Sequence, residues 1–127
     1  VKPGENESPI THEASEFPVE QWQEWASPVW MTVNQTNVLN VKAARSEKDE
    51  KHLCPLQLDV IDRALVMWSN PGDVVLSPFM GIGSEGYGSL KAGRKFIGVE
   101  LKPEYWRQAC ENLKGAAAQG DLLSLVG

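Results

Sequence analysis

Three glycines and one glutamate have the residue types and the spacing to bind a ligand. Gly81, Gly83 and Gly86 follow an apolar run in the pattern G-x-G-x-x-G, and Glu100 ends a second apolar run. Glycine lets the main chain approach a ligand where a side chain would block it. A carboxylate can accept hydrogen bonds from both hydroxyls of a ribose, each worth about 1.5–3 kcal/mol. The pattern predicts a site for a nucleoside-containing ligand.

A strand–turn–helix–strand unit must hold these residues together. The apolar run 74–76 predicts a strand leading into the glycine turn, a helix is expected over 84–92, and a second strand over 95–99 leads to Glu100. Parallel strands joined by a right-handed crossover end at the same edge of their sheet. The ligand is therefore expected beside residues 77–83 and the glutamate.

Two more helices are expected around this unit. Apolar residues recur every three or four positions between 57 and 68, which predicts one helix face. A second helix begins at Lys102-Pro103, and its inner face would carry Tyr105, Ala109 and Leu113. The tail 122–126 could be a third strand or a frayed helix end. The order helix, strand, helix, strand, helix predicts an α/β fold with a parallel sheet and flanking helices.

The bulk properties restrict the class of protein. The 127 residues suit one domain, and 42% hydrophobic residues can form its core. A net charge of −5 disfavours non-specific attraction to DNA. The cysteines and histidines lack the spacing of a metal site or a disulfide framework. No apolar run of about 18 residues is present, so we expect a soluble, cytoplasmic protein without membrane association. Because the chain begins at Val1 rather than methionine, we expect a fragment or a processed form.

The first part of the chain is expected to differ from the rest. Residues 1–50 are predicted to be an extended arm and linker with a tryptophan-rich segment, and residues 51–127 the ligand-binding α/β domain. Trp22, Trp25 and Trp30 are expected to anchor the arm on the domain. The alternative interpretation is a surface for base stacking or for a partner.

Three other groups of side chains receive structural interpretations. Cys54 is expected to be a small buried residue, and Trp106 is expected in the core. The asparagines of N-Q-T-N-V-L-N are expected to make turns and helix caps, with contact to DNA or a cofactor as the alternative; they are Asn34, Asn37 and Asn40.

The glycine turn could bind either of two ligands. In a dinucleotide site the first strand runs directly into the first glycine, and the pyrophosphate lies at the helix N-terminus. In this chain residues 77–80 intervene, and Glu85 falls in the first helical turn, where a carboxylate would repel a pyrophosphate. S-adenosylmethionine carries no phosphate, and its sulfonium would favour an aromatic face such as that of Phe79.

Three segments together carry a family resemblance. Residues 77–84, S-P-F-M-G-I-G-S, resemble the D-P-F-x-G-x-G-[ST] cofactor motif of DNA amino-methyltransferases, which modify adenine N6 or cytosine N4. Residues 52–58 resemble the element that precedes this motif in the family. Residues 94–100 and the following Tyr105 match its second-strand pattern. The resemblance covers about residues 50–115.

The resemblance implies part of a Rossmann-like fold that binds S-adenosylmethionine, with DNA as the substrate of the intact enzyme. Phe79, Gly81 and Gly83 would line the cofactor, Glu100 would hold its ribose, and residues 55–56 would border its methionine end. The full set of residues that it assigns to the cofactor is Cys54, Pro55, Leu56, Ser77, Pro78, Phe79, Gly81, Gly83, Ser84, Glu100 and Leu101.

The chain departs from the family pattern in two places. Ser77 replaces an aspartate that would help to hold the ammonium group of the cofactor. The catalytic tetrapeptide [DNS]-P-P-[YFW], which receives the target amino group and stacks on the extruded base, is missing. Its nearest counterpart is Ser27-Pro28-Val29-Trp30, a weak catalytic candidate that fits an arm segment better. We therefore expect the C-terminal portion of a methyltransferase, inactive alone, whose catalytic and target-recognition region lies elsewhere in the same polypeptide.

Two other classes of function stay open on the sequence. One is a fragment of a nicotinamide-dependent oxidoreductase, which the glycine pattern alone would also suit. The other is a non-catalytic interaction module that uses the three tryptophans of the arm. A glycine-rich tight turn with an incidental strand-end glutamate is the structural alternative to any ligand site.

Overall fold

A computed structural model of the protein describes residues 9–39 and 54–124, without the side chains of 120–124. Residues 1–8 and 40–50 of the predicted arm and linker lie outside these ranges, as do the first two residues of the 52–58 segment. No helix in the described ranges is long and apolar enough to span a bilayer. The elements in chain order are α1 (Val19–Trp25), α2 (Leu58–Trp68), β1 (Val74–Ser77), α3 (Ser84–Lys91), β2 (Lys95–Gly98) and α4 (Pro103–Ser124).

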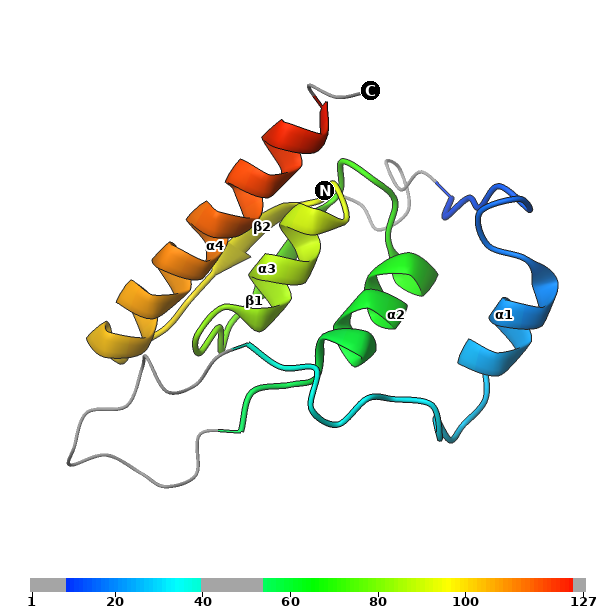
Figure 1. Ribbon diagram of the computed structural model, residues 1–127, viewed down its shortest axis with the longest axis horizontal. Helices are drawn as coiled ribbons and strands as arrows, with labels where there is room; N and C mark the ends of the chain where they lie inside the picture. Colours follow the sequence, from blue (N-terminus) through cyan, green and yellow to red (C-terminus); the bar gives the residue numbers. More distant parts are fainter. Residues whose placement is uncertain (1–8, 40–53, 125–127) are drawn as a thin grey trace, which may run out of the picture.

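The two strands form a parallel pair, as the sequence predicts. Val74 lies opposite Lys95, and Ser77 lies opposite Gly98. Helix α3 connects the strands and packs on one face of the sheet, while α2 and α4 pack on either side of α3 (Figure 1). The three helices thus form one layer over one face of the sheet. The predicted α/β class with a parallel sheet is confirmed.

The core lies between this helical layer and the covered face of the sheet. Its buried apolar residues come from α2, from the glycine turn and from α4; they are Ile61, Leu65, Met80, Ile82, Ala109 and Ala116. Helix α4 contacts α3 through small residues such as Ala109, so the two helices approach closely. Trp106 lies outside that stripe and is half exposed. The expectation that it belongs to the core is therefore wrong.

Arg94 connects the end of α2 to the start of β2. Its guanidinium donates to the carbonyl of Ser69 at 2.8 Å, to the carbonyl of Leu65 at 3.3 Å and to the carbonyl of Ala92. Desolvation by its surroundings lowers the pKa of Arg94, while the charge of Asp73 acts in the opposite direction. Arg94, which belongs to the segment 94–100 that resembles the family pattern, thus has a structural role: it links α2 to β2.

The arm is more ordered than its composition predicts, because residues 19–25 form helix α1 instead of an extended segment. Pro18 precedes the helix, and Glu20 lies in its first turn, where an acid favours helix formation. The arm runs along α2 on the side away from the sheet (Figure 1). At its start the amide of Thr11 donates to Asn70 Oδ1 at 3.0 Å.

The arm is fixed to α2 by a buried guanidinium. Arg63 lies 5.5 Å from the ring centre of Trp25 and 5.3 Å from that of Trp30, and it donates to the hydroxyl of Thr32 at 2.8 Å. Such cation–π contacts strengthen when the charge is desolvated, and Arg63 is buried. The anchoring interpretation is confirmed for these two tryptophans, whereas Trp22 is half exposed.

Asp59, in the first turn of α2, holds the other end of the arm. Its carboxylate accepts the backbone N–H of Asn34 at 2.7 Å and the side-chain amide of Asn37 at 2.5 Å. These two hydrogen bonds lower the pKa of Asp59 below its ordinary value. The bond from Asn34 has the largest effect, and the bond from Asn37 has the second largest. The turn interpretation is confirmed for Asn34, whose side-chain oxygen accepts the backbone N–H of Thr36 at 3.0 Å. No side chain caps the N-terminus of α2, so the capping interpretation is wrong for Asn34 and Asn37, and Asn40 lies outside the described residues.

This carboxylate predicts a pH dependence of arm attachment. Because the pKa of Asp59 is lower in the folded state, the ionised carboxylate stabilises the attachment of the arm. This stabilisation is fully present above the ordinary pKa of about 3.9. It is lost as the pH falls through the folded value. We expect the carboxyl carbon of Asp59 to titrate in NMR spectra below about pH 3.9, together with the Asn34 amide signal. An Asp59→Asn variant should lose this shared titration, and a midpoint at or above the ordinary value would contradict the assignment.

Candidate cofactor-binding site

The glycine turn leaves β1 and begins α3 at the carboxyl end of the sheet. The amide of Met80 donates to the carbonyl of Val99 at 2.9 Å, which ties the turn to the chain just after β2. Gly81 and Gly83 adopt positive φ angles of 55° and 86°. These are left-handed conformations that favour glycine, so the turn requires glycine at both positions.

Glu100 lies directly against this turn. One of its carboxylate oxygens accepts the backbone N–H of Gly81 at 2.9 Å, and the other accepts the N–H of Lys102 at 2.8 Å. The two backbone donors fix the carboxylate at the point where both strands end. The expected proximity of residue 100 to the bend is therefore confirmed, together with the parallel pairing on which it depends.

The surface around Gly81 and Glu100 is open. A Cβ atom added at Gly81 would meet no atom within 4 Å. The apolar side chains next to both residues extend into solvent, with Phe79 87% exposed and Leu101 94% exposed. Bare main chain, a fixed carboxylate and two exposed apolar side chains can together hold a ligand with a polar ribose and apolar or aromatic parts.

Gly83 and Gly86 have a different environment from Gly81. A Cβ atom at Gly83 would lie 2.7 Å from Leu113 Cδ1 and 3.1 Å from Ala109 Cβ. At Gly86 it would lie 2.6 Å from the ring of Phe96. Of the three glycines of the motif, these two therefore allow α3 to pack on α4 and on the sheet, while Gly81 faces open space.

Two serines of the predicted cofactor set are buried. Ser77 ends β1, and Ser84 begins α3 with a hydroxyl oxygen that has no hydrogen-bond partner. An unpartnered buried hydroxyl at a helix N-terminus can still donate or accept a hydrogen bond. Pro78 between them is exposed.

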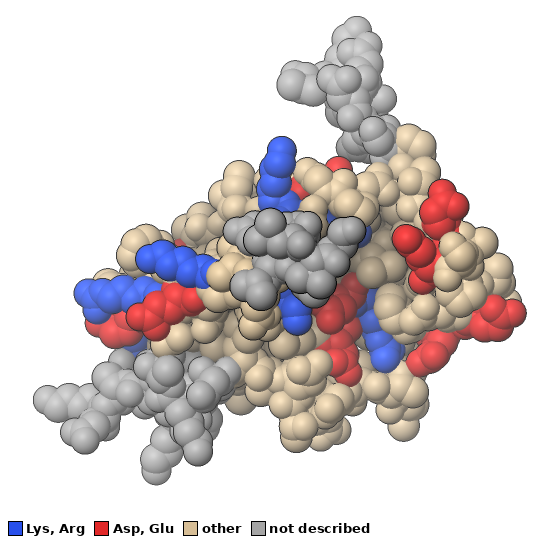
Figure 2. All heavy atoms as spheres, turned by 45° about the horizontal axis from the view of Figure 1, so that its top comes forward, with Lys and Arg blue, Asp and Glu red and all other residues tan. Residues whose placement is uncertain are grey.

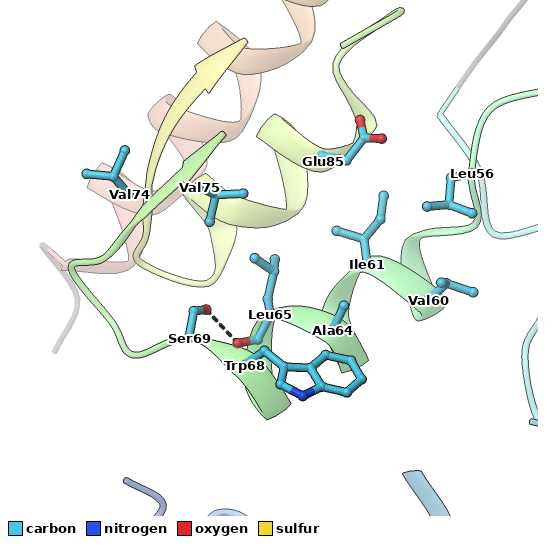
Figure 3. A pocket seen from close by; sticks show the side chains of 10 residues that line it. All are labelled: Leu56, Val60, Ile61, Ala64, Leu65, Trp68, Ser69, Val74, Val75 and Glu85. Carbon is cyan, nitrogen blue, oxygen red and sulfur yellow. Dashed lines mark hydrogen bonds between the residues drawn. The ribbon is translucent and has the colours of Figure 1, made fainter. Parts of the chain in front are cut away.

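Residues 54–56 approach the same region from α2. Cys54 is exposed, so the expectation of a small buried cysteine is wrong. Pro55 is half buried, and the side chains of Leu56 and of Glu85 in α3 line the same cavity (Figure 3). The structure thus brings Leu56 close to the start of α3, whereas no described contact joins residues 54–56 to Glu100.

Asn112 is a supporting residue that sequence reasoning missed. From α4 its side-chain amide donates to the carbonyl of Ile82 at 2.8 Å, so it holds the glycine turn from below. Lys102 supplies the second backbone donor to Glu100. Neither residue type nor spacing marks Asn112 in the sequence, because its contact depends on the packing of α4 against the turn.

The weak catalytic candidates lie on the arm. The hydroxyl of Ser27 accepts the amide of Val29 at 3.5 Å, and the indole N–H of Trp30 donates to the carbonyl of Trp25 at 2.7 Å. Pro28 stands between them in an exposed segment. Because the arm lies beyond α2, no described contact joins these residues to the glycine turn (Figure 1).

Charge on the surface does not form a basic stripe on the face drawn in Figure 2. Lysine and arginine side chains are scattered among acidic ones, and acidic side chains gather toward the arm. A surface that follows the DNA backbone is normally basic. This face is therefore poorly suited to hold DNA by itself.

The fold and the site have the arrangement typical of nucleoside-binding α/β proteins, with a glycine turn after one parallel strand and a carboxylate after the next. The chain belongs to a family of DNA methylases, whose family model, N6_N4_Mtase, matches residues 2–111. The family resemblance seen in the sequence is thereby confirmed.

Individual relatives and a solved structure agree with this membership. The chain is 36% identical to the DNA adenine methyltransferase YhdJ of Escherichia coli over 64% of its own length and 28% of the relative's. It is 29% identical to the type II methyltransferase M.BglI of Bacillus subtilis over 89% of this chain and 28% of that protein. TTHA0409 of Thermus thermophilus, solved in complex with S-adenosyl-L-methionine, matches with a TM-score of 0.63 and 27% identity, over 91% of this chain and 41% of that one. The chain thus spans little more than a quarter of the two curated relatives.

Proposed function

We propose that this chain is the S-adenosylmethionine-binding portion of an enzyme that methylates an exocyclic amino nitrogen of adenine or cytosine in DNA. The observation that carries the proposal is the Glu100 carboxylate, hydrogen-bonded at 2.9 Å to the amide of Gly81 beside open space. Membership of the DNA methylase family supports it. The complex of TTHA0409 with S-adenosyl-L-methionine supports the choice of cofactor.

The residues present fit this cofactor. Glu100 would accept hydrogen bonds from the ribose hydroxyls through the lone pairs that its two backbone donors leave free. The open main chain at Gly81 would allow the nucleoside to lie against the turn. Phe79 and Leu101 would supply exposed apolar surface to the cofactor. When bound, S-adenosylmethionine supplies the activated methyl group.

The methionine end of the cofactor is expected near the start of α3. The unpartnered hydroxyl of Ser84 and the side chain of Leu56, which lines a cavity with Glu85, are the groups available there. Ser77 offers a hydroxyl where the family usually has an aspartate, and it brings no charge to attract the cofactor's ammonium. We therefore expect weak binding by this chain alone.

The oxidoreductase alternative is disfavoured by the charge of the turn. Glu85 lies in the first turn of α3, where a dinucleotide would place its pyrophosphate. Two negative groups at that point would repel each other. The absence of phosphate from S-adenosylmethionine removes this repulsion.

The transfer step is assigned to a part of the enzyme that the chain does not include. The arm segment 27–30 makes packing contacts, and the face drawn in Figure 2 lacks a basic stripe. The task of this chain in the cytoplasmic enzyme is to hold and orient the methyl donor, so that the extruded base can attack in line. A catalytic and target-recognition region in the same polypeptide would bind the DNA.

Isothermal calorimetry with S-adenosylhomocysteine and with NAD tests this function. We expect the chain to bind S-adenosylhomocysteine in the range of about 10 µM to 1 mM, because a single domain with one charged ribose contact gives modest affinity. NAD should bind at least tenfold more weakly. We also expect no methyl transfer to DNA by the isolated chain. Tighter binding of NAD would refute the assignment, and measurable DNA methylation would make residues 27–30 the active site.

A further inference from the structure

The glycine turn between β1 and α3 contains two residues that place few limits on the backbone. Gly81 and Gly83 have φ angles of 55° and 86°, and glycine adopts positive and negative φ about equally readily. On local grounds alone, several orientations of the peptide units in this turn are therefore accessible. The orientation that the structure shows must be selected by contacts from outside the turn.

Helix α4 makes two kinds of contact with the turn. Ala109 and Leu113 pack against Gly83, where an added Cβ atom would lie 3.1 Å from Ala109 Cβ and 2.7 Å from Leu113 Cδ1. Asn112 lies on the same side of the helix, three residues after Ala109. Its side-chain amide donates to the carbonyl of Ile82 at 2.8 Å. The packing contacts set the distance between α4 and the turn, whereas the hydrogen bond sets the direction of the Ile82 carbonyl.

The peptide unit between Ile82 and Gly83 is held at both ends. Its carbonyl accepts the hydrogen bond from Asn112. Its N–H, which belongs to Gly83, donates to the carbonyl of Met80 at 2.9 Å. Rotation of this peptide unit would break both hydrogen bonds, so the side chain of α4 and the turn together fix its orientation.

A second peptide unit carries the connection to the carboxylate. The carbonyl of Met80 belongs to the same peptide unit as the N–H of Gly81, which donates to Glu100 at 2.9 Å. Three hydrogen bonds in series therefore connect Asn112 to Glu100 through two peptide units. We call this series the relay. Hydrogen bonds in such a series polarise and strengthen one another.

Gln108 orients the amide of Asn112. One turn earlier on α4, its Nε2 donates to Oδ1 of Asn112 at 3.2 Å. Because the oxygen of the Asn112 amide is engaged by this donor, the NH2 group of the same amide faces the Ile82 carbonyl. Both side chains are half buried, which limits the access of competing water.

We propose that Asn112, oriented by Gln108, is a positioning residue for the methyl donor and acts through the relay on the Glu100 carboxylate. This inference rests on the proposed function, in which Glu100 accepts hydrogen bonds from the ribose. Without the hydrogen bond from α4, the glycine turn would adopt other peptide orientations, and the carboxylate would lose one of its two fixed donors. Part of the binding free energy would then go into ordering the turn, which lowers the affinity.

Removal of the donor at position 112 tests the proposal. Asn112→Leu keeps a side chain of similar size without the hydrogen bond, and we expect it to weaken binding of S-adenosylhomocysteine by about fivefold or more. Asn112→Asp is the second variant if the first fails to fold, with the same expectation, because an ionised carboxylate accepts hydrogen bonds but cannot donate one to the Ile82 carbonyl. Binding is measured at neutral pH by NMR titration of the 127-residue chain, which follows affinities into the millimolar range.

The amide of Gly81 gives a spectroscopic readout that a purely structural role of Asn112 would not change. In the ligand-free Asn112→Leu chain, this amide proton should exchange with solvent about tenfold faster or more, because its hydrogen bond to Glu100 is no longer held by the relay. Its NMR signal should also shift in the direction expected for a weakened hydrogen bond. The amides in the middle of α4 should keep their exchange rates, since the helix itself is unchanged.

Two further variants on α4 separate the orienting step from general effects on the helix. Gln108→Glu replaces the donor by a carboxylate that can only accept. Asn112 would then turn its NH2 group toward residue 108 and its oxygen toward the Ile82 carbonyl, so we expect about the same loss of affinity as for Asn112→Leu. Glu111→Ala removes an exposed side chain next to Asn112 and should change neither the affinity nor the Gly81 signal.

Three outcomes would overturn the positioning role. They are an unchanged affinity in a folded Asn112 variant, an equal loss in Glu111→Ala, and a loss of affinity without any change at the Gly81 amide. Failure of the unmodified chain to bind S-adenosylhomocysteine would instead refute the proposed function. The exchange rate of the Gly81 amide is measured without ligand and reports on the relay alone. A failure of the relay is thus distinguishable from a failure of the proposed function.

Discussion

Replacing Glu100 with alanine is expected to weaken binding of S-adenosylhomocysteine by about 100-fold or more, equivalent to ~2.7 kcal/mol. The carboxylate would accept bonds from the ribose, and hydrogen bonds to a charged group contribute about 1.5–3 kcal/mol each. The same substitution removes the acceptor that holds the amide of Gly81 at 2.9 Å. The ligand would then lose a direct contact and also the fixed geometry of the turn.

Two further variants separate these contributions in calorimetry. Glu100→Gln keeps one carbonyl acceptor without the charge, and we expect a loss of about tenfold, since a neutral bond is weaker than a charge-assisted one. Glu104→Ala removes an exposed acid in the first turn of α4 and should leave the affinity unchanged. Equal affinities for wild type and Glu100→Ala would show that the cofactor does not use this carboxylate.

The strand–turn–strand unit could be predicted because its determinants are local. Gly81 and Gly83 mark positive φ angles, and the short apolar runs mark strands that end at one edge of the sheet. Once the crossover is right-handed and parallel, the position of Glu100 beside the turn follows from topology. The fold around the site is therefore encoded within about thirty residues, on the scale of one crossover unit.

The remaining features depend on contacts between distant segments. Arg63 is buried between two tryptophans of an arm that is far away in sequence, and composition alone predicted that arm to be extended. Asn112 supports the turn only because α4 packs against it. Trp106 has the residue type of a core side chain and lies on the outer side of α4. Periodicity gives a helix its face, but the partner of that face is decided by tertiary packing.

Substitution of Gly86 by valine is expected to destabilise the fold by about 3 kcal/mol, at the upper end of the usual cost of overpacking. A Cβ atom there would lie 2.6 Å from Cε1 and 2.7 Å from Cδ1 of Phe96, and 3.1 Å from Cδ1 of Leu113. Leu113 can change its rotamer, but the ring of Phe96 is rigid and lies between α3 and the sheet. Relief of the clash must therefore move α3 away from β2, which would be measured as a lower free energy of unfolding in urea.

Gly115 offers the matched control within the same chain, because it is also a helical glycine and has open space where its Cβ would be. Gly115→Val should be neutral or stabilising by a few tenths of a kcal/mol or so, since valine has a higher helix propensity than glycine. If the two valine variants were equally stable, close packing of α3 would not explain Gly86. If only Gly86→Val is destabilised, the last glycine of the motif acts through packing. The G-x-G-x-x-G pattern would then combine a ligand-facing glycine with glycines that seat the helix on the sheet.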